Sequence, residues 1–224
     1  MTYVAEPGVD LAQFPLVTPQ SRLAARQHFG LAADAEVVGV AARLVRDKGM
    51  LEVLGAAEQL LATRPRLHFL IAGTGVLERE LRERVLAAGL ADRIHLLGCQ
   101  ETAEMPRFYA AIDLLVLASR REGRPISVME AVASGLPVVA TPVGDIPLMV
   151  KNGINGVIIN GVEEAAIAQG IAQVLESPSC TRRAYQHNTL LRHQFDYWAC
   201  CGAVEGIYQN VALLPAVWRQ PILG

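Results

Sequence analysis

The sequence predicts an α/β fold in which buried strands of a parallel sheet alternate with helices. Two short segments, 114–118 and 137–141, are almost wholly apolar, as strands covered on both faces of a sheet are. Between them, Pro125 stands where a helix would begin and Gly135 where it would end. Strand, loop, helix and strand form one right-handed crossover, so the loop 120–124 follows the carboxyl end of the first strand. Open parallel sheets bind ligands at that edge, beside helix amino termini.

Every other predicted element is either a short apolar strand or a longer segment with helical periodicity. Gly30 ends the first helix, and charges four residues apart on 78–88 predict an exposed helix face. In chain order, the predicted elements are helix 20–29, strand 36–42, helix 49–63, strand 67–72, helix 78–88, strand 91–98, helix 105–112, the crossover, a turn and strand at 152–159, helix 163–175 and helix 195–214.

The amino-acid composition limits which class of protein this chain can be. The 224 residues suffice for one large domain, with 52% hydrophobic and 19% charged residues and a net charge of −2. This balance favours a soluble α/β protein and gives no electrostatic reason to expect nucleic acid as a partner. No apolar run approaches the roughly 18 residues of a membrane span. The four cysteines lack metal-site spacing, and Cys180 is expected in a late loop, so free thiols in a reducing cytoplasm are predicted.

Two carboxylates accompany the central crossover. Glu122 precedes the predicted helix, and Glu130 follows after seven intervening residues, about 7 Å along that helix. Paired carboxylates repel a phosphate but accept hydrogen bonds from neighbouring hydroxyls, such as those of a sugar or ribose. On spacing alone this signal is weak, and two unrelated carboxylates are the favoured interpretation.

The glycine turn after the strand 67–72 does not fit a dinucleotide-binding dehydrogenase. Gly73 and Gly75 are followed by Glu78, where the fingerprint needs a third glycine. That fingerprint also belongs after the first strand rather than the second.

Residues 122–140, EGRPISVMEAVASGLPVVA, resemble the pattern EGxPxxxxEAxAxGxPVVA of retaining glycosyltransferases with the GT-B fold, in the family of glycosyl group 1 transferases. In that family the first Glu lies by the donor sugar and the second holds the nucleotide ribose, which implies these roles for Glu122 and Glu130. The segment 42–49, ARLVRDKG, resembles the family's GRLxxxKG, whose Arg and Lys grip the donor diphosphate. The resemblance therefore implies catalytic roles for Arg43, Lys48 and Glu122.

The resemblance also implies a set of residues around the donor. Gly123 and Arg124 would orient the sugar through their amides, while Gly73 and Gly75 would shape the floor of the site. His95 alternates away from the loop, which favours a structural role for it. Departures from the family pattern are Asp145 for a glycine and Leu148 for a glutamate. Besides Glu130, the residues implied to bind the donor are Gly123, Arg124, Pro125, Ile126, Gly73, Gly75, Ile94, His95 and Leu96.

The fold implied by the resemblance is a doubly wound, six-stranded parallel sheet of Rossmann type, the C-terminal half of a GT-B enzyme. Residues 1–33 would form a hinge-derived segment and a short helix, because 8–14 resembles the family's NGVDxxxF turn. Residues 34–176 would bind the donor, and 177–224 would form C-terminal helices and an apolar tail. Trp218, Ile222 and Leu223 of that tail are expected to pack on their own domain, with a partner, the missing half or a membrane surface as alternatives.

The implied function is binding of a nucleotide-diphosphate sugar, UDP rather than GDP, for retaining transfer of a hexosyl group. The acceptor, a saccharide or lipid-linked saccharide in polysaccharide or lipopolysaccharide biosynthesis, would be held by an N-terminal domain that this chain lacks. No metal or other cofactor is expected, because the seven aspartates are too scattered for an Asp-x-Asp motif. The expected location is the cytoplasm, with its membrane face as an alternative. Three rivals remain: a non-catalytic or split-subunit binding module, a nucleotide-sugar epimerase of the same architecture and a pure interaction module.

Overall fold

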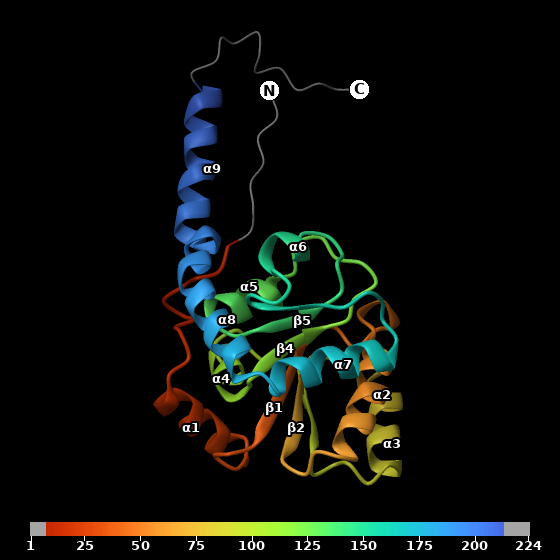
Figure 1. Cartoon of the computed structure of the whole chain (residues 1–224). Coiled ribbons are helices and arrows are strands. Elements are labelled where there is room, and N and C mark those ends of the chain that lie inside the picture. Colours follow the sequence, from red (N-terminus) through yellow and green to blue (C-terminus); the bar gives the residue numbers. More distant parts are fainter. Residues whose placement is uncertain (1–7, 213–224) are drawn as a thin grey trace, which may run out of the picture.

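A computed structural model describes residues 8–212 and contains one six-stranded parallel sheet in the order β3-β2-β1-β4-β5-β6. This arrangement confirms the predicted doubly wound fold (Figure 1). The strand order reverses between β1 and β4, which pair through Val38 with Leu114 and Gly39 with Leu115. The strands are β1 (Glu36–Ala41), β2 (Leu67–Ala72), β3 (Ile94–Gly98), β4 (Leu114–Leu117), β5 (Val138–Ala140) and β6 (Gly156–Ile158).

Helices cover both faces of the sheet. Side chains from α2, α3 and α7 form the core on one face, and those from α1, α4, α5 and α6 form the core on the other. The helices are α1 (Pro19–His28), α2 (Met50–Leu61), α3 (Glu78–Ala87), α4 (Met105–Ala111), α5 (Ile126–Ala133), α6 (Ile146–Met149), α7 (Glu164–Leu175), α8 (Pro178–Leu191) and α9 (Tyr197–Ala212), with short 3-10 helices η1 (Arg46–Lys48) and η2 (Arg192–Phe195).

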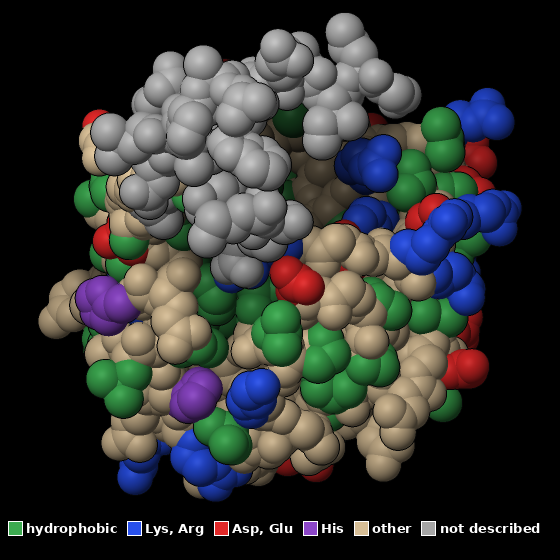
Figure 2. Space-filling view, turned by 90° about the horizontal axis from the view of Figure 1, so that it is seen from above, with side chains coloured by type: hydrophobic (Ala, Val, Ile, Leu, Met, Phe, Trp, Pro, Cys, Tyr) green, Lys and Arg blue, Asp and Glu red, His purple; other side chains and the backbone are tan. Residues whose placement is uncertain are grey.

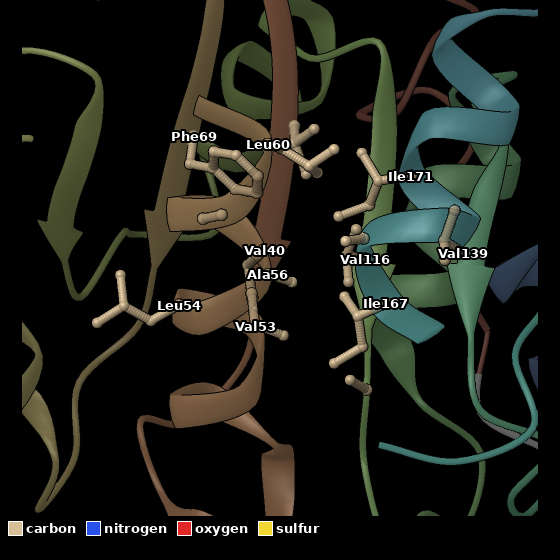
Figure 3. Close-up of a cluster of buried hydrophobic side chains, with 14 of the residues drawn as sticks. Val40, Val53, Leu54, Ala56, Leu60, Phe69, Val116, Val139, Ile167 and Ile171 are labelled. Atoms are coloured by element: carbon tan, nitrogen blue, oxygen red, sulfur yellow. The ribbon is translucent and has the colours of Figure 1, made fainter. Parts of the chain in front are cut away.

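Successive side chains along each strand point to opposite faces of the sheet and so contribute alternately to the two cores. Val38 of β1 belongs to the α2/α7 side and its neighbour Val37 to the α4/α5 side, and both are fully buried. Figure 3 shows Val116 of β4 beside Ile167 and Ile171 of α7. Burying each such side chain contributes roughly 1.5–3 kcal/mol, so continuously apolar strands are what a sheet covered on both faces requires.

The structure corrects the sequence-based expectations at several points. Cys180 lies buried in the first turn of α8 rather than in a loop, and the short helix α6 is absent from the predicted elements. The last predicted helix, 195–214, is interrupted at Asp196, between η2 and α9. Helix α5 begins at Ile126, with Pro125 as its N-cap rather than its first residue.

Helix α8 escaped prediction because its buried stripe is narrow and partly polar. Only Cys180, Ala184 and Asn188, spaced four residues apart, are buried among its fourteen residues. The Ser177 side chain caps the helix by accepting a hydrogen bond from the Cys180 amide at 3.3 Å. Such a helix is held by its cap and by a buried amide rather than by an apolar face.

The first described residues run beside the start of α9. The Val9 amide donates to the Phe195 carbonyl oxygen at 2.7 Å, and the Tyr197 amide donates to that of Val9 at 3.0 Å. The Arg192 guanidinium donates to the carbonyl oxygens of Leu11 and Phe14 at 3.1 and 2.8 Å. Segments far apart in sequence are therefore joined at one place.

Two expectations concern membranes. Trp218, Ile222 and Leu223 lie outside the described residues. Within residues 8–212, no helix has the length and apolar character needed to cross a bilayer.

Candidate functional site

The loops after β1 and β4 meet because these strands are neighbours at the centre of the sheet. There the Lys48 ammonium lies 2.6 Å from Glu122 Oε1, and the Ser119 hydroxyl donates to the same oxygen at 2.6 Å. The side chains of Lys48 and Glu122 are only 15% and 10% exposed. The structure thus brings together two residues predicted from separate motifs. It fixes Oε1 of Glu122, and no described residue makes a hydrogen bond or ion pair to Oε2.

A glycine allows these two loops to touch. Gly49 adopts the left-handed conformation, with φ of 65°, and a Cβ added to it would lie 2.2 Å from the Ala118 carbonyl oxygen. Any other residue would push the end of β4 away from the loop that carries Lys48. The close approach of these two loops therefore explains why a glycine follows Lys48 in the sequence motif.

Glu130 occupies a different environment on the inner side of α5. The hydroxyl of Tyr109, from α4, donates to Glu130 Oε2 at 2.7 Å. Burial raises the pKa of Glu130 to about 6, against the downward effect of the hydrogen bond from Tyr109. Burial, followed by the charge of Glu130, raises the pKa of Tyr109 well above its usual range. A half-buried acceptor whose Oε1 makes no hydrogen bond to any described residue suits a ligand hydroxyl.

A cavity of about 350 Å³ lies against Glu130 at the carboxyl edge of the sheet. Arg43 lies on its wall, is exposed, and makes no ion pair with any described residue. Seen from above, the molecule is hollowed next to a group of Lys and Arg side chains (Figure 2). The cavity is lined by Ala41, Ala42, Arg43, Ala72, Gly73, Thr74, Cys99, Gln100, Met105, Ile126, Ser127 and Glu130. Its size is at the lower end of small-ligand sites.

The two predicted floor glycines hold the β2 loop against the β1 loop. A Cβ on Gly73, whose φ is 139°, would lie 1.9 Å from the Ala42 carbonyl oxygen. A Cβ on Gly75 would lie 2.3 Å from the Leu44 carbonyl oxygen. Gly73 lines the cavity and Gly75 lies just beyond it, so both keep the backbone close enough to form its base.

The predicted residues of β3 are placed differently. Ile94, His95 and Leu96 lie within the strand and do not line the cavity. The Nε2 atom of His95 lies 3.3 Å from Nδ1 of His68 on β2, and burial lowers the pKa of both rings, which favours a neutral pair. Cys99 and Gln100, directly after β3, line the cavity instead, because only residues at the carboxyl end of a parallel strand reach this edge.

The residues after Glu122 fix the loop to the turn that follows β5. The Asp145 amide donates to the Gly123 carbonyl oxygen at 2.8 Å, and a Cβ on Gly144 would lie 2.2 Å from that oxygen. The Arg124 guanidinium lies 3.5 Å from Asp145 Oδ2 and 5.6 Å from the Phe195 ring centroid. Arg124 therefore connects the Glu122 loop to the segment before α9 and does not line the cavity.

Sequence reasoning missed several residues of the site. Tyr109 and Ser119 contact the two glutamates, and Thr74, Cys99, Gln100, Met105 and Ser127 line the cavity. Position at a strand's carboxyl end could have indicated Ser119, Thr74, Cys99 and Gln100. Tyr109, which is fully buried in α4, gives no comparable signal in the sequence.

A larger hollow of about 1020 Å³ lies at the opposite edge, where Glu36 begins β1 and Asp113 precedes β4. None of the predicted site residues lines it. The smaller cavity is the better candidate because it combines open polar groups with the carboxyl edge of the sheet. Among residues 8–212, no group of three or more His, Cys, Asp or Glu side chains could hold a metal ion.

Comparisons with known proteins agree with this architecture. Residues 21–190 match the family model described as glycosyl transferases group 1. D-inositol 3-phosphate glycosyltransferase of Mycolicibacterium smegmatis is 34% identical over 183 residues, which cover 81% of this chain and 42% of that protein. The chain thus spans less than half the length of this curated relative.

Two solved structures are similar as well. HepE of Anabaena in complex with UDP and glucose is 25% identical, with a TM-score of 0.79, covering 92% of this chain and 55% of that one. The C-terminal domain of a glycosyl transferase group 1 family protein from Francisella tularensis is also 25% identical, with a TM-score of 0.72. This match covers 82% of our chain and 97% of that domain.

Proposed function

The chain belongs to the glycosyl transferases group 1 family, and from this premise we propose that it binds a nucleoside diphosphate sugar for retaining glycosyl transfer. The observation that carries the proposal is the cavity of about 350 Å³ that joins Arg43 and Glu130 at the carboxyl edge of the sheet. The Lys48–Glu122 pair lies on the neighbouring loops at that edge.

Each part of the donor has a matching group. The Glu130 carboxylate accepts hydrogen bonds from ribose hydroxyls, and the base occupies the cavity beside Gln100. Arg43 and Lys48 face the diphosphate, which gains negative charge as it leaves the sugar, so their role is electrostatic. An ammonium has three N–H donors, and Lys48 keeps its contact with Glu122 while it meets a phosphate oxygen. The open oxygen of Glu122 then receives a sugar hydroxyl.

We further propose UDP rather than GDP as the carrier, a donor site without metal, and an acceptor saccharide or lipid-linked saccharide held by another part of the whole protein. The similarity to HepE, whose structure is a complex with UDP and glucose, supports the choice of UDP. The share of the relative that this chain spans supports a site completed by another domain. The second candidate function is a module that binds the donor without transferring it. The same observation, that the chain spans only part of its relative, favours it.

The test is calorimetric titration of the purified chain with UDP, GDP, UDP-glucose and GDP-mannose. We expect UDP ligands to bind and GDP ligands to bind at least tenfold more weakly. Glu130→Gln should weaken UDP binding about tenfold or more, the value of a charge-assisted hydrogen bond. Absence of binding by every nucleotide would refute the proposal.

A transfer assay tests whether the site needs a second domain. The chain by itself should release no sugar to an acceptor above the background rate, because a cleft with one wall does not exclude water. Transfer by the isolated chain would show that no second domain is needed.

A further inference from the structure

We propose that Tyr109 is a positioning residue that holds the Glu130 carboxylate in the orientation that receives the nucleotide. This inference rests on the proposed function, in which Glu130 meets the ribose. Tyr109 does not line the cavity and acts only through Glu130.

The ring of Tyr109 is buried and packs between two other aromatic rings. It is fully buried, with the Phe14 ring centroid at 5.8 Å and that of Phe108 at 5.2 Å, both edge-on. Edge-to-face pairs of this kind restrict rotation of the ring. Its hydroxyl can therefore reach only what lies beyond the end of the ring.

Two acceptors lie at that point. Glu130 Oε2 is 2.7 Å from the hydroxyl and the Ser127 carbonyl oxygen is 3.2 Å away. A phenol has one proton, and the shorter contact to a charged acceptor is the stronger hydrogen bond. Tyr109 thus donates to Glu130 and fixes Oε2, which leaves Oε1 for the cavity.

This hydrogen bond has two consequences for the ligand. A glutamate held in one rotamer has already lost side-chain entropy that binding would otherwise cost. The hydrogen bond also favours the ionised carboxylate, which accepts from ribose hydroxyls, against the burial that favours the neutral acid.

The other titratable groups around Glu130 do not replace this donor. Arg43 and Cys99 lie on the cavity wall after β1 and β3. Arg192, on η2 packed against α5, donates to the carbonyl oxygens of Leu11 and Phe14. The hydrogen bond from Tyr109 is the one that lowers the pKa of Glu130.

The experiment compares Tyr109→Phe with the unaltered chain by calorimetric titration of UDP-glucose between pH 5 and pH 9. UDP-glucose is used because the terminal phosphate of UDP itself titrates at about pH 6, whereas the diphosphate diester does not. At pH 8 we expect a three- to tenfold loss of affinity, about the value of one hydrogen bond. Affinity should fall on acidification near pH 6 in the unaltered chain. In Tyr109→Phe this midpoint should move to higher pH, which loss of packing alone would not cause.

Two variants serve as controls. Tyr185→Phe removes a hydroxyl from α8 at the opposite hollow and should change neither affinity nor midpoint. In Glu130→Gln the pH midpoint should vanish, and adding Tyr109→Phe should weaken binding no further. Equal affinity and equal midpoint in Tyr109→Phe would overturn the positioning role, whereas unchanged UDP affinity in Glu130→Gln would overturn the proposed function itself.

A second measurement covers the case in which Tyr109→Phe does not fold. Biosynthetic replacement of the five tyrosines by 3-fluorotyrosine keeps the ring and makes the phenol a stronger donor. The pH midpoint of UDP-glucose binding should then move to lower pH, opposite to the effect of phenylalanine. A midpoint that stays in place or rises would contradict the proposal.

Discussion

At the scale of single residues, the two glutamates of the motif have different environments and therefore different properties. Glu122 lies against a cation and a hydroxyl, whereas Glu130 lies in a half-buried position with one phenol donor. Environments of this kind separate the tasks of like residues. We expect Glu122 to act next to the charged diphosphate, and we expect nucleotide binding through Glu130 to depend on pH.

Glu130 should reduce the stability of the fold that carries it. Its pKa is about 6 in the folded chain against 4.5 for a free glutamate, so the folded state binds a proton more tightly. Stability therefore falls as pH rises from 4.5 and has lost about 2 kcal/mol above pH 6. Glu130→Gln keeps an acceptor for Tyr109 and avoids the charge. Urea unfolding should show it more stable than the unaltered chain by up to about 2 kcal/mol at pH 7.5.

The pH dependence identifies the cause of that gain. The difference should shrink towards pH 4.5, where both chains are neutral at this position. Glu101→Gln, at an exposed position, should have no comparable effect. A gain that is the same at pH 4.5 and pH 7.5 would show that ionisation is not its cause.

Lys48→Ala should weaken UDP binding by about tenfold or more, since it removes a charged donor and leaves Glu122 without its counter-charge. Titration at pH 8 measures the effect. Arg46→Ala, an exposed cation two residues earlier on the same short helix, is the matched control and should bind UDP normally. Equal losses in both variants would indicate a general charge effect rather than a contact.

At the scale of elements, burial decides what could be predicted. The strands were predictable because every residue from Leu114 to Leu117 is buried, which permits only apolar side chains. Helix α8 was not predictable, because its few buried positions include the polar residue Asn188. Contacts between distant elements, such as that of Tyr109 with Glu130, leave no mark in local spacing. The motif indicated Lys48 and Glu122, but only the sheet order brings their loops together.

The loop pair at Gly49 offers a test at this scale. Gly49→Ala forces a side chain into the left-handed region, which costs roughly 1–2 kcal/mol, and also places a Cβ against the Ala118 carbonyl oxygen. Gly89→Ala has nearly the same φ, 66°, but nothing within 4 Å of the new Cβ. Urea unfolding should show the larger loss for Gly49→Ala, and UDP titration should show a loss for that variant alone. Similar behaviour of both would mean that the close approach is unimportant.

At the scale of the whole molecule, the proposed metal-free site leaves the charge of the diphosphate to the cations of the chain. The described residues hold no group of three metal-ligating side chains, and Arg43 and Lys48 lie at the same edge of the sheet. UDP binding should therefore persist in excess EDTA and weaken as salt rises. Titration with and without EDTA checks this, with sodium chloride varied separately. Loss of binding in EDTA that Mg²⁺ restores would contradict the metal-free site.

The pairing of the first described segment with the start of α9 places both connections of the domain at one point. Val9 and Asp196 form a parallel bridge, so the chain enters and leaves the unit between them side by side. A unit with adjacent junctions can be spliced into a surface loop of a carrier protein through two short linkers. The same geometry means that force applied to either connection reaches the domain at the same place, because Val9 is hydrogen-bonded to both Phe195 and Tyr197.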